Sequence, residues 1–178
     1  MTAQDYINLY APYAVADSAK SGVPASITLA QGLLESNNGN SQLFTNGDNS
    51  FGIKCAGGWT GATQYANDDL PNECFRSYDS VAQSFSDHSL FLQTQSRYSN
   101  LFSFPITDYK SWANGLQQDG YATSPTYAQS LINIIEQYNL QQYDVQAQTK
   151  QTQRFVFIAV IVFVSICGFI YLIRKKAI

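Results

Sequence analysis

GVPASITLAQGLLESNNGNS, residues 22–41, carries the strongest structural signal in the chain. Pro24 suits the first turn of a helix, which we expect from Ala25 to about Ser36. The Asn- and Gly-rich residues that follow predict a loop over 37–52. The stretch therefore predicts a buried helix that ends at a polar loop. Its core-facing residues, at helical spacing, are Ile27, Ala30, Leu33 and Leu34.

Glu35 places a carboxyl group at the end of this apolar helix. Burial disfavours the charged form of a carboxyl group and raises its pKa, which suits a general acid at neutral pH. A carboxylate in the last turn of a helix can equally be a solvated surface group. Both interpretations of Glu35 stay open on this segment alone.

Helical patterns with start and stop signals lie on both sides of the segment. Residues 53–78 hold short β-type runs between turn residues and predict a small hairpin. The expected fold is a mostly helical α+β domain of residues 1–140 with one small β-hairpin lobe. The further helices are expected over about 3–21 with Pro12 at a restart and Gly22 as the stop, from Asp79 or Ser80 to about Gln95, from Thr107 or Asp108 to about Gln118, and over 125–139.

Charge is divided unevenly along the 178 residues. Residues 1–154 contain seven Lys and Arg against thirteen Asp and Glu, a net charge of −6, whereas residues 174–176 contribute +3. A net acidic domain argues against a duplex nucleic-acid binder, which needs a basic stripe. One His and three Cys argue against a metal cluster, and a Ser-His-Asp or Cys-His triad would have to use His88. We therefore expect no metal, cofactor or nucleic-acid partner.

Residues 155–173, FVFIAVIVFVSICGFIYLI, contain no charged side chain. As a helix they reach about 28 Å, close to the roughly 30 Å of a bilayer's hydrocarbon core. The run predicts one C-terminal transmembrane helix in the lipid bilayer, followed by a basic tail, 174–178. Residues 141–154 are Gln-rich and predict a tether, flexible or partly helical.

The charges that flank this run predict its orientation. Three bases on the C-terminal side place that end inside the cell and the domain on the periplasmic or extracellular side. Lys150 and Arg154 on the other flank leave a margin of three bases against two. The N-terminal residues lack the basic and apolar regions of a cleavable signal peptide.

Cys55 and Cys74 flank the predicted hairpin and are 19 residues apart. On its two arms their side chains could meet, and a disulfide across such a loop stabilises by about 3 kcal/mol in the chain-entropy model. A bridge agrees with an external domain and is the favoured interpretation, while two reduced, partly buried thiols are the alternative. Cys167 lies in the apolar run, where we expect a small apolar side chain.

Four stretches, in order, resemble the glucosaminidases of glycoside hydrolase family seventy-three, which are bacterial cell-wall hydrolases. The resemblance covers about residues 6–139, and the paired cysteines are most similar to the branch found in Bacteroidetes. The stretches are residues 22–41 around Glu35, Asn49-Ser50-Phe51-Gly52-Ile53-Lys54, Cys74-Phe75-Arg76-Ser77-Tyr78 with Ser80 and Asp87-His88 beyond it, and Gly120-Tyr121-Ala122-Thr123-Ser124-Pro125-Thr126-Tyr127-Ala128.

The resemblance implies a lysozyme-like fold with a substrate cleft between the helical core and the hairpin lobe. It implies hydrolysis of β-1,4 bonds next to N-acetylglucosamine in peptidoglycan. Glu35 matches the family's catalytic general acid, and Tyr121 matches its functionally important tyrosine. The family often has a Glu on the hairpin, in a Thr-Glu-Tyr context, where this chain has Thr63-Gln64-Tyr65.

The second catalytic group is open, because Gln64 is not a carboxylate. Asp68 and Asp69 follow a few residues later and could reach the cleft or belong to a solvated turn. The N-acetyl group of the substrate could also attack, leaving the protein to supply acid and positioning.

The candidate substrate-binding residues are Asn49, Phe51, Trp59 and Tyr127. An Asn can bond to sugar amides and hydroxyls, and an aromatic face can stack on a pyranose ring. Core packing is the alternative for the aromatics and the favoured one for Phe51. His88 is interpreted as a structural residue of its helix.

Three functions fit these features. The first is a membrane-tethered endo-β-N-acetylglucosaminidase with peptidoglycan strands as its partner. The second is a lytic transglycosylase or muramidase, which also works from one essential Glu. The third is a catalytically inactive wall-binding or structural membrane protein. A lytic domain on a single anchor also suits a virion lysin in the internal membrane of a phage.

Overall fold

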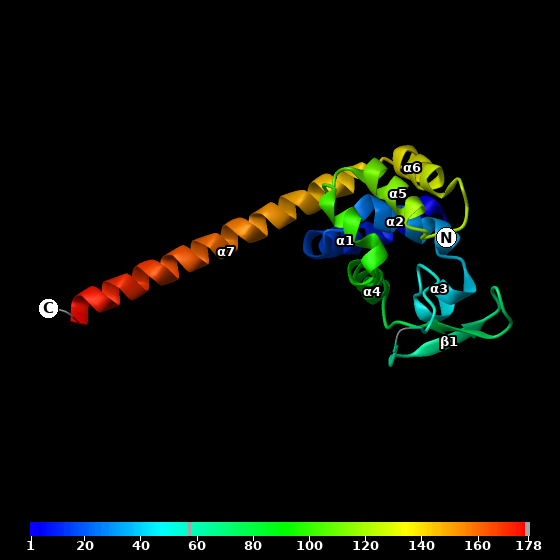
Figure 1. The fold of residues 1–178 in the computed structure, drawn as a ribbon, viewed down its shortest axis with the longest axis horizontal. Coiled ribbons are helices and arrows are strands. Elements are labelled where there is room, and N and C mark those ends of the chain that lie inside the picture. Colours follow the sequence, from blue (N-terminus) through cyan, green and yellow to red (C-terminus); the bar gives the residue numbers. More distant parts are fainter. Residues whose placement is uncertain (57, 177–178) are drawn as a thin grey trace.

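The computed structural model describes the backbone of residues 1–56 and 58–176, and their side chains except those of 160 and 164–176. Figure 1 shows a helical body, a two-stranded hairpin at its lower side and one long helix that projects away from it. This confirms the expected mostly helical α+β class. The elements are α1 (Ala3–Ser21), α2 (Ala25–Glu35), α3 (Gln42–Gly47), β1 (Thr63–Ala66), β2 (Glu73–Arg76), α4 (Val81–Thr94), the 3-10 helix η1 (Ser96–Ser103), α5 (Tyr109–Gln118), α6 (Tyr127–Gln137) and α7 (Gln141–Lys176).

Helix α2 is the central element of the body, because it contacts α1, α5, α6 and α7. All its residues from Ala25 to Leu33 are buried, including three polar ones. Thr28 donates to its own helix at the Pro24 carbonyl, whereas Ser26 and Gln31 bond to α7 and α6. Hydrogen bonds thus allow a helix with one apolar face to be buried on every side.

The predicted helix boundaries rest on caps that the structure confirms. Gly22 ends α1 in the left-handed region (φ 80°) and donates to the Ser18 carbonyl. Ser80 and Asp108 cap α4 and α5 by accepting bonds from backbone N–H groups. Helix α1 continues through Pro12 without a restart, because Pro12 lies on the exposed face, where water can satisfy the freed carbonyl.

The predicted loop over 37–52 contains a short helix, α3. Asn37 and Asn38 adopt left-handed conformations (φ 51° and 57°) and turn the chain directly after Glu35. Ser41 then caps α3, and its buried Phe44 packs 5.8 Å from the ring of Tyr6 on α1. The loop is therefore tied to the core, and it holds the entrance to the hairpin in place.

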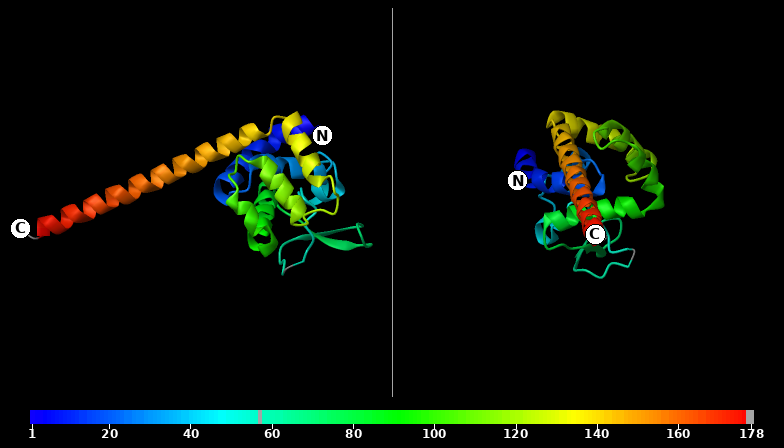
Figure 2. Two further views of the ribbon diagram at one scale, coloured as in Figure 1. Left: turned by 45° about the horizontal axis from the view of Figure 1, so that its top comes forward. Right: turned by 90° about the vertical axis from the view of Figure 1, so that its left-hand side faces the viewer.

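The hairpin is an antiparallel pair of four-residue strands, β1 and β2. Cys74 on β2 is bonded to Cys55, which confirms the predicted disulfide. The left view of Figure 2 shows that this lobe and α7 leave the body in different directions. Of the side chains on β1 and β2, that of Phe75 is buried, and the others are half-buried or exposed.

The stretch predicted as a tether, 141–154, flexible or partly helical, is the start of α7, and its first turns pack on the body. Asp144 and Ala147 are fully buried, and α7 contacts α1 as well as α2. Asp144 accepts bonds from the Ser26 backbone N–H (2.8 Å) and hydroxyl (2.6 Å). Because Pro24 offers no side-chain cap, Asp144 caps α2, and the packed domain continues past the predicted limit at residue 140.

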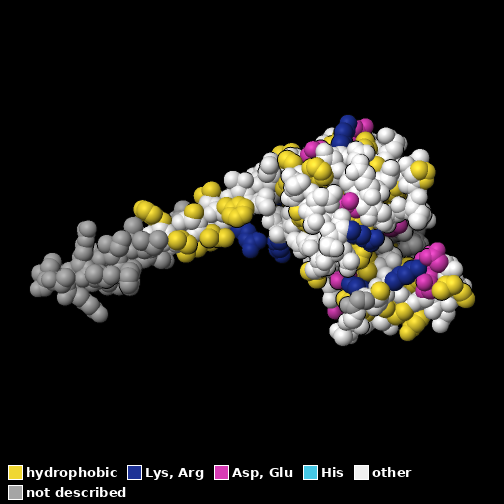
Figure 3. All heavy atoms as spheres, in the orientation of Figure 1, with side chains coloured by type: hydrophobic (Ala, Val, Ile, Leu, Met, Phe, Trp, Pro, Cys, Tyr) yellow, Lys and Arg dark blue, Asp and Glu magenta, His cyan; other side chains and the backbone are white. Residues whose placement is uncertain are grey.

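Within the part of the chain that the structure describes, no helix is both long and apolar enough to cross a membrane. The predicted span 155–173 has described side chains only at 155–159 and 161–163. The rest of that span and the basic tail 174–178 lie outside the described side chains. Figure 3 shows apolar side chains on the projecting helix beyond the body.

Candidate active site

Glu35 is the last residue of α2 and sits at the carboxyl end of the buried helix. Ser36 holds this end, since its hydroxyl accepts a bond from the Gly39 N–H (2.8 Å) and its carbonyl accepts one from the Ser41 N–H (2.8 Å). The negative end of the helix dipole disfavours a carboxylate in the last turn. The backbone therefore places Glu35 where its neutral form is favoured.

Tyr127 on α6 donates a hydrogen bond to Oε1 of Glu35 (3.2 Å) and accepts one from Nε2 of Gln31 (2.9 Å). Tyr127 and Gln31 are both buried. Protein atoms crowd the Glu35 carboxyl on this side and raise its pKa, and the bond from Tyr127 opposes part of that rise. The side chain stays exposed on its other side, so a substrate can reach it.

Two hollows meet at Glu35. The hairpin-side hollow, about 370 Å³, is lined by Glu35, Ser41, Gln42, Leu43, Phe51, Gly52, Ala66, Asn67, Asp68 and Phe75. The helix-side hollow, about 320 Å³, is lined by Glu35, Phe51, Gly52, Ile53, Lys54, Phe91, Arg97, Tyr98, Tyr121 and Ala122. Because they share Glu35, Phe51 and Gly52, the hollows form one groove that passes over the carboxyl group.

Phe51 and Gly52 line both hollows, and the backbone and packing of each residue suit this position. Gly52 has a φ of 62°, which favours glycine, and open space where a Cβ would lie. Phe51 is 6% exposed and stacks on His88 with ring centroids 3.9 Å apart. Phe51 therefore belongs to the core and also lines the groove, so both interpretations of this residue describe part of its role.

His88 is fully buried, and neither ring nitrogen has a hydrogen-bond partner among the described residues. Burial lowers its pKa to about 3, so the ring is neutral at ordinary pH. It supports Phe51 from below and lies 6.1 Å from the ring of Tyr121. This arrangement agrees with the structural interpretation of His88.

Tyr121 lines the helix-side hollow beside the acid. Its ring stacks on that of Tyr127 at a centroid distance of 5.6 Å and an angle of 20°. Burial, together with the negative charge of Glu35, raises the pKa of Tyr121. The hydroxyl therefore stays protonated and can donate a hydrogen bond. The structure brings together three residues that the sequence singled out: Glu35, Tyr121 and Tyr127.

Asp68 and Asp69 lie at the hairpin turn, and the structure separates their positions. Asp68 lines the hairpin-side hollow with Glu35, whereas the Asp69 side chain is 87% exposed and is not part of either lining. The Nζ atom of Lys54 binds Asp68 at 3.0 Å, Asp69 at 3.3 Å and Glu73 at 2.9 Å. Of the two aspartates, Asp68 is the one placed to act in the groove.

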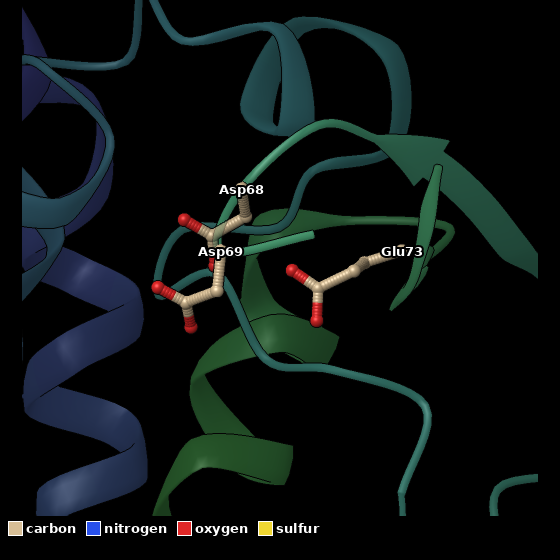
Figure 4. Close-up of side chains that lie close together, drawn as sticks. All are labelled: Asp68, Asp69 and Glu73. Atoms are coloured by element: carbon tan, nitrogen blue, oxygen red, sulfur yellow. The ribbon is translucent and has the colours of Figure 1, made fainter. Parts of the chain in front are cut away.

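Figure 4 shows the carboxylates of Asp68, Asp69 and Glu73 close together. Their ligand atoms lie within 4.8 Å of one another, a spacing that could hold a metal ion. The ammonium group of Lys54 bonds to all three and provides positive charge within the cluster. The geometry is therefore that of an ion-pair network that ties the hairpin turn to the strand beside it.

Gln64 occupies the hairpin position at which the resembled family often has Glu. Its Nε2 atom donates to the Leu43 carbonyl (2.9 Å) and the Arg76 carbonyl (3.3 Å). A carboxylate could not donate these bonds. Gln64 thus fastens β1 to α3 and β2, and it lies outside the lining of the hairpin-side hollow.

Asn49 and Trp59 are not among the described residues that line the two hollows, and their role in substrate binding stays a prediction. Asn49 is 1% exposed, and its amide bonds to the backbone of Phe51, Ile53 and Arg76. Trp59 donates to the Ala62 carbonyl, and its ring lies 4.8 Å from the Arg76 guanidinium. Both side chains hold the base of the hairpin in shape.

The sequence reasoning did not single out Gln31, which lies behind the groove, or Arg97, which lines it. Gln31 orients Tyr127, and its position one helical turn before Glu35 was a usable signal. Arg97 lines the helix-side hollow from η1, a 3-10 helix that no periodicity predicted. Nothing in the local sequence distinguishes Arg97 from an ordinary surface arginine.

Comparisons with known proteins agree with this geometry. Residues 11–140 match the family described as mannosyl-glycoprotein endo-beta-N-acetylglucosaminidase. The exo-glucosaminidase LytG of Bacillus subtilis is 34% identical over 130 residues, which cover 67% of this chain and 45% of LytG. The peptidoglycan hydrolase FlgJ of Escherichia coli K12 is 36% identical over 132 residues, covering 67% of this chain and 42% of FlgJ.

Solved structures give the same result. The glycoside hydrolase domain of Salmonella typhimurium FlgJ superposes with a TM-score of 0.68 at 30% identity, covering 86% of this chain and 99% of that domain. The catalytic domain of the Listeria monocytogenes autolysin Auto superposes with a TM-score of 0.67 at 31% identity, covering 79% and 86%. The chain spans less than half the length of the two curated relatives above. From the match over 11–140 and these relatives, the chain belongs to the glucosaminidase family.

Proposed function

We propose that this protein is a peptidoglycan glucosaminidase, a glycoside hydrolase that cleaves β-1,4 bonds next to N-acetylglucosamine with Glu35 as general acid. The observation that carries the proposal is the position of Glu35 at the junction of the two hollows, with its pKa raised and its orientation set by Tyr127. The names of the relatives, an exo-glucosaminidase and a peptidoglycan hydrolase, support this substrate class.

In the proposed reaction, Glu35 transfers its proton to the glycosidic oxygen as the C–O bond to the leaving sugar breaks. The sugar that remains becomes oxocarbenium-like, and a water oxygen bonds to its anomeric carbon. Asp68, the second carboxylate in the groove, accepts the proton that this water loses. The ion pair with Lys54 (3.0 Å) orients Asp68 for that role.

Tyr121 is the proposed orienting residue. Its hydroxyl stays protonated in the helix-side hollow, so it can donate a hydrogen bond to the N-acetyl group of the substrate or to the developing charge. If that N-acetyl group attacks the anomeric carbon, Asp68 is dispensable for the first step. The second catalytic group is thus a choice between Asp68 and the substrate itself.

Mass spectrometry of digested peptidoglycan tests the proposal. Reducing N-acetylglucosamine ends are expected, and ends that carry ¹⁸O should form in labelled water. Glu35→Gln should abolish their release. Asp68→Asn should slow release by about a hundredfold if Asp68 is the base, with Asp69→Asn as the matched control. Equal, small effects of the two Asp variants would favour attack by the N-acetyl group.

One observation favours a second function within cell-wall cleavage. Gln64 replaces the hairpin carboxylate, so a lytic transglycosylase, in which the 6-hydroxyl of the sugar is the nucleophile, remains a candidate. Anhydro-muramic ends without ¹⁸O would identify it. A chain that releases neither product, yet binds the wall, would be the inactive wall-binding protein.

We also propose that residues 155–173 anchor the protein in a bilayer, with the catalytic domain on the wall-facing side and the C-terminus inside. The support is the uncharged sequence and the exposed apolar side chains at its described start, Phe155, Val156, Phe157, Ile158, Val162 and Phe163. Because α7 is packed through Ala147, only about 10 Å of helix separates the domain from residue 155. The groove would therefore stay close to the membrane.

Fractionation tests the anchor. The full chain should remain with membranes after alkaline carbonate washing, and a chain that ends at residue 154 should be released. Protease added outside intact cells should degrade the domain; a protected domain would reverse the orientation. Finding the protein in purified virions would support a location in the internal membrane of a phage. The pairing of Cys55 with Cys74 supports a Bacteroidetes-like origin.

A further inference from the structure

We propose that Arg97 binds a carboxylate carried by the muramoyl residue of the substrate, and so selects peptidoglycan over neutral glycans. This inference rests on the proposed function and assigns a substrate class to one half of the groove. Arg97 lines the helix-side hollow together with Glu35 and Tyr121. It is the feature of the groove that acid catalysis does not use.

Arg97 is the available cation of the groove. The described residues that line the two hollows include two cations, Lys54 and Arg97. Lys54 is bonded to three carboxylates. No hydrogen bond or ion pair engages Arg97 among the described residues. One half of the groove therefore presents an uncompensated positive charge in a domain that is net acidic.

The position of Arg97 is supported from below. Its guanidinium lies 4.6 Å from the ring centroid of Tyr98, which is fully buried. A guanidinium held against an aromatic face keeps the N–H groups along its edge free for a planar acceptor. A carboxylate fits this edge with two parallel hydrogen bonds. The arrangement is pre-organised for an anion and offers no acceptor for a cation.

The opposite half of the groove offers no such cation among its described lining residues. The hairpin-side hollow contains Asp68 and Glu35, and no Lys or Arg is among its described lining residues. A glycan of N-acetylglucosamine alone is neutral and has no group that distinguishes the two halves. A muramoyl residue carries a lactyl group, whose carboxylate is either free or extended by a peptide that has carboxylates of its own. Such a strand can place its carboxylate beside Arg97 in only one of its two directions along the groove.

Binding measurements in the inactive Glu35→Gln background test the proposal. The ligands are a soluble disaccharide-peptide fragment, the same glycan with the peptide removed to leave the lactyl carboxylate, and an oligomer of N-acetylglucosamine. Adding Arg97→Gln should raise the Kd of a carboxylate-bearing ligand about tenfold and leave the Kd of the neutral oligomer unchanged. The first two ligands show whether the peptide or the lactyl group supplies the carboxylate.

Controls separate charge recognition from packing. Arg97→Lys keeps the charge and should restore part of the affinity, and Lys20→Gln on α1 removes an equal charge outside the two linings. The Arg97-dependent difference should shrink as salt increases. An equal loss for all three ligands, or no loss for any, would overturn the inference. If the wild-type protein leaves peptidoglycan uncleaved while Arg97 still discriminates, the proposed function fails and the binding inference stands.

Discussion

The helical core raises the pKa of its buried carboxyl groups, whereas a cation in the hairpin lobe lowers the pKa of Glu73. In the core, burial raises the pKa of Glu35, Asp17 and Asp144. In the lobe, the bond from Lys54 lowers the pKa of Glu73, and the same ammonium holds Asp68 and Asp69. The difference follows from what surrounds each group: neutral donors and apolar side chains in the core, a fixed cation in the lobe.

This contrast gives the groove two unlike walls. The core wall favours a protonated carboxyl group, because burial raises the pKa of Glu35 and its hydrogen-bond partner among the described residues is a neutral tyrosine. The hairpin wall places a carboxylate against a cation, because Asp68 is paired with Lys54. A two-carboxylate glycosidase uses one carboxyl group as acid and one carboxylate as base. Under the proposed function, the core wall supplies the acid, and the hairpin wall supplies the base if the substrate's N-acetyl group does not take that role.

The largest expected effect comes from removing the acid on the core wall. Glu35→Gln should lower the rate of reducing-end release from peptidoglycan by about a thousandfold, since a positioned general acid contributes 10² to 10⁴. Because Gln is neutral and similar in shape, the free energy of unfolding should not fall. Rates and urea unfolding measured on the same preparation test both statements. A rate within tenfold of wild type would remove Glu35 from the mechanism.

The lobe should respond differently, because cross-links replace a core there. Its strands are four residues each, and Phe75 is the described lobe side chain from β1 and β2 that is buried. Replacing both Cys55 and Cys74 by Ser should destabilise the lobe by about 3 kcal/mol, the chain-entropy value for a loop of this length. Hydrogen exchange should rise in residues 53–78 and stay unchanged in α1 and α2.

Cys167 is left unchanged in the double variant. Activity should fall with the lobe, since Asp68 lies on it. If exchange rises equally throughout the described body, lobe and core unfold together, and the contrast between them is one of charge alone.

The parts of the structure that the sequence predicts are those whose signals lie within a few residues. The elements with local signals were predicted: Gly22 and Pro24 bound α2, Ser80 and Asp108 cap their helices, and two cysteines mark the hairpin. Glu35 stood out because it ends an apolar helix. These features depend on neighbours a few residues away, so a single sequence contains them.

The missed features depend on contacts between distant residues. Asp144 looked like part of a Gln-rich tether, yet it caps a helix that begins 119 residues earlier, at Ala25. Asn49 was predicted to bind sugar, and its amide also donates to the Arg76 carbonyl, 27 residues away. Whether a polar side chain serves a substrate or the backbone is decided by tertiary packing, which spacing along the chain does not encode.

Asp144 provides a separate test of how the core affects carboxyl groups, because it is buried in the core and lies outside the groove. Burial raises its pKa to about 6 from an ordinary value of 3.8. The folded state therefore binds the proton more tightly than the unfolded state. This contribution to stability is complete below about pH 4 and is lost as the pH rises through 6; it amounts to about 2–3 kcal/mol.

Asp144→Asn removes this titration while keeping a side chain that can accept from the Ser26 N–H. Relative to wild type, the variant should gain about 2–3 kcal/mol in the free energy of unfolding between pH 4 and pH 7. Urea unfolding at several pH values measures the difference, in which the other raised carboxyl groups cancel. A constant difference across this range would show that Asp144 does not titrate there.

The smallest expected effect comes from removing the hydrogen bond that Tyr127 on the core wall donates to Glu35. Tyr127 donates to the charged form of Glu35 and so lowers its pKa, against the larger effect of burial. Tyr127→Phe removes the donor but keeps the ring that stacks on Tyr121. The pKa of Glu35 should rise, so more of the acid stays protonated at neutral pH. The alkaline limb of the pH–rate profile should move to higher pH.

The same change leaves Nε2 of Gln31 without its acceptor, which should cost about 1–2 kcal/mol of stability. Gln31→Leu added to Tyr127→Phe removes that unpaired donor and should recover part of the loss, while the shifted limb remains. The double variant would then recover stability but keep the shifted pH dependence, as expected if Tyr127 acts on Glu35 directly. A limb that stays in place, or moves to lower pH, would mean that the groove and its substrate set the acidity of Glu35 without the tyrosine.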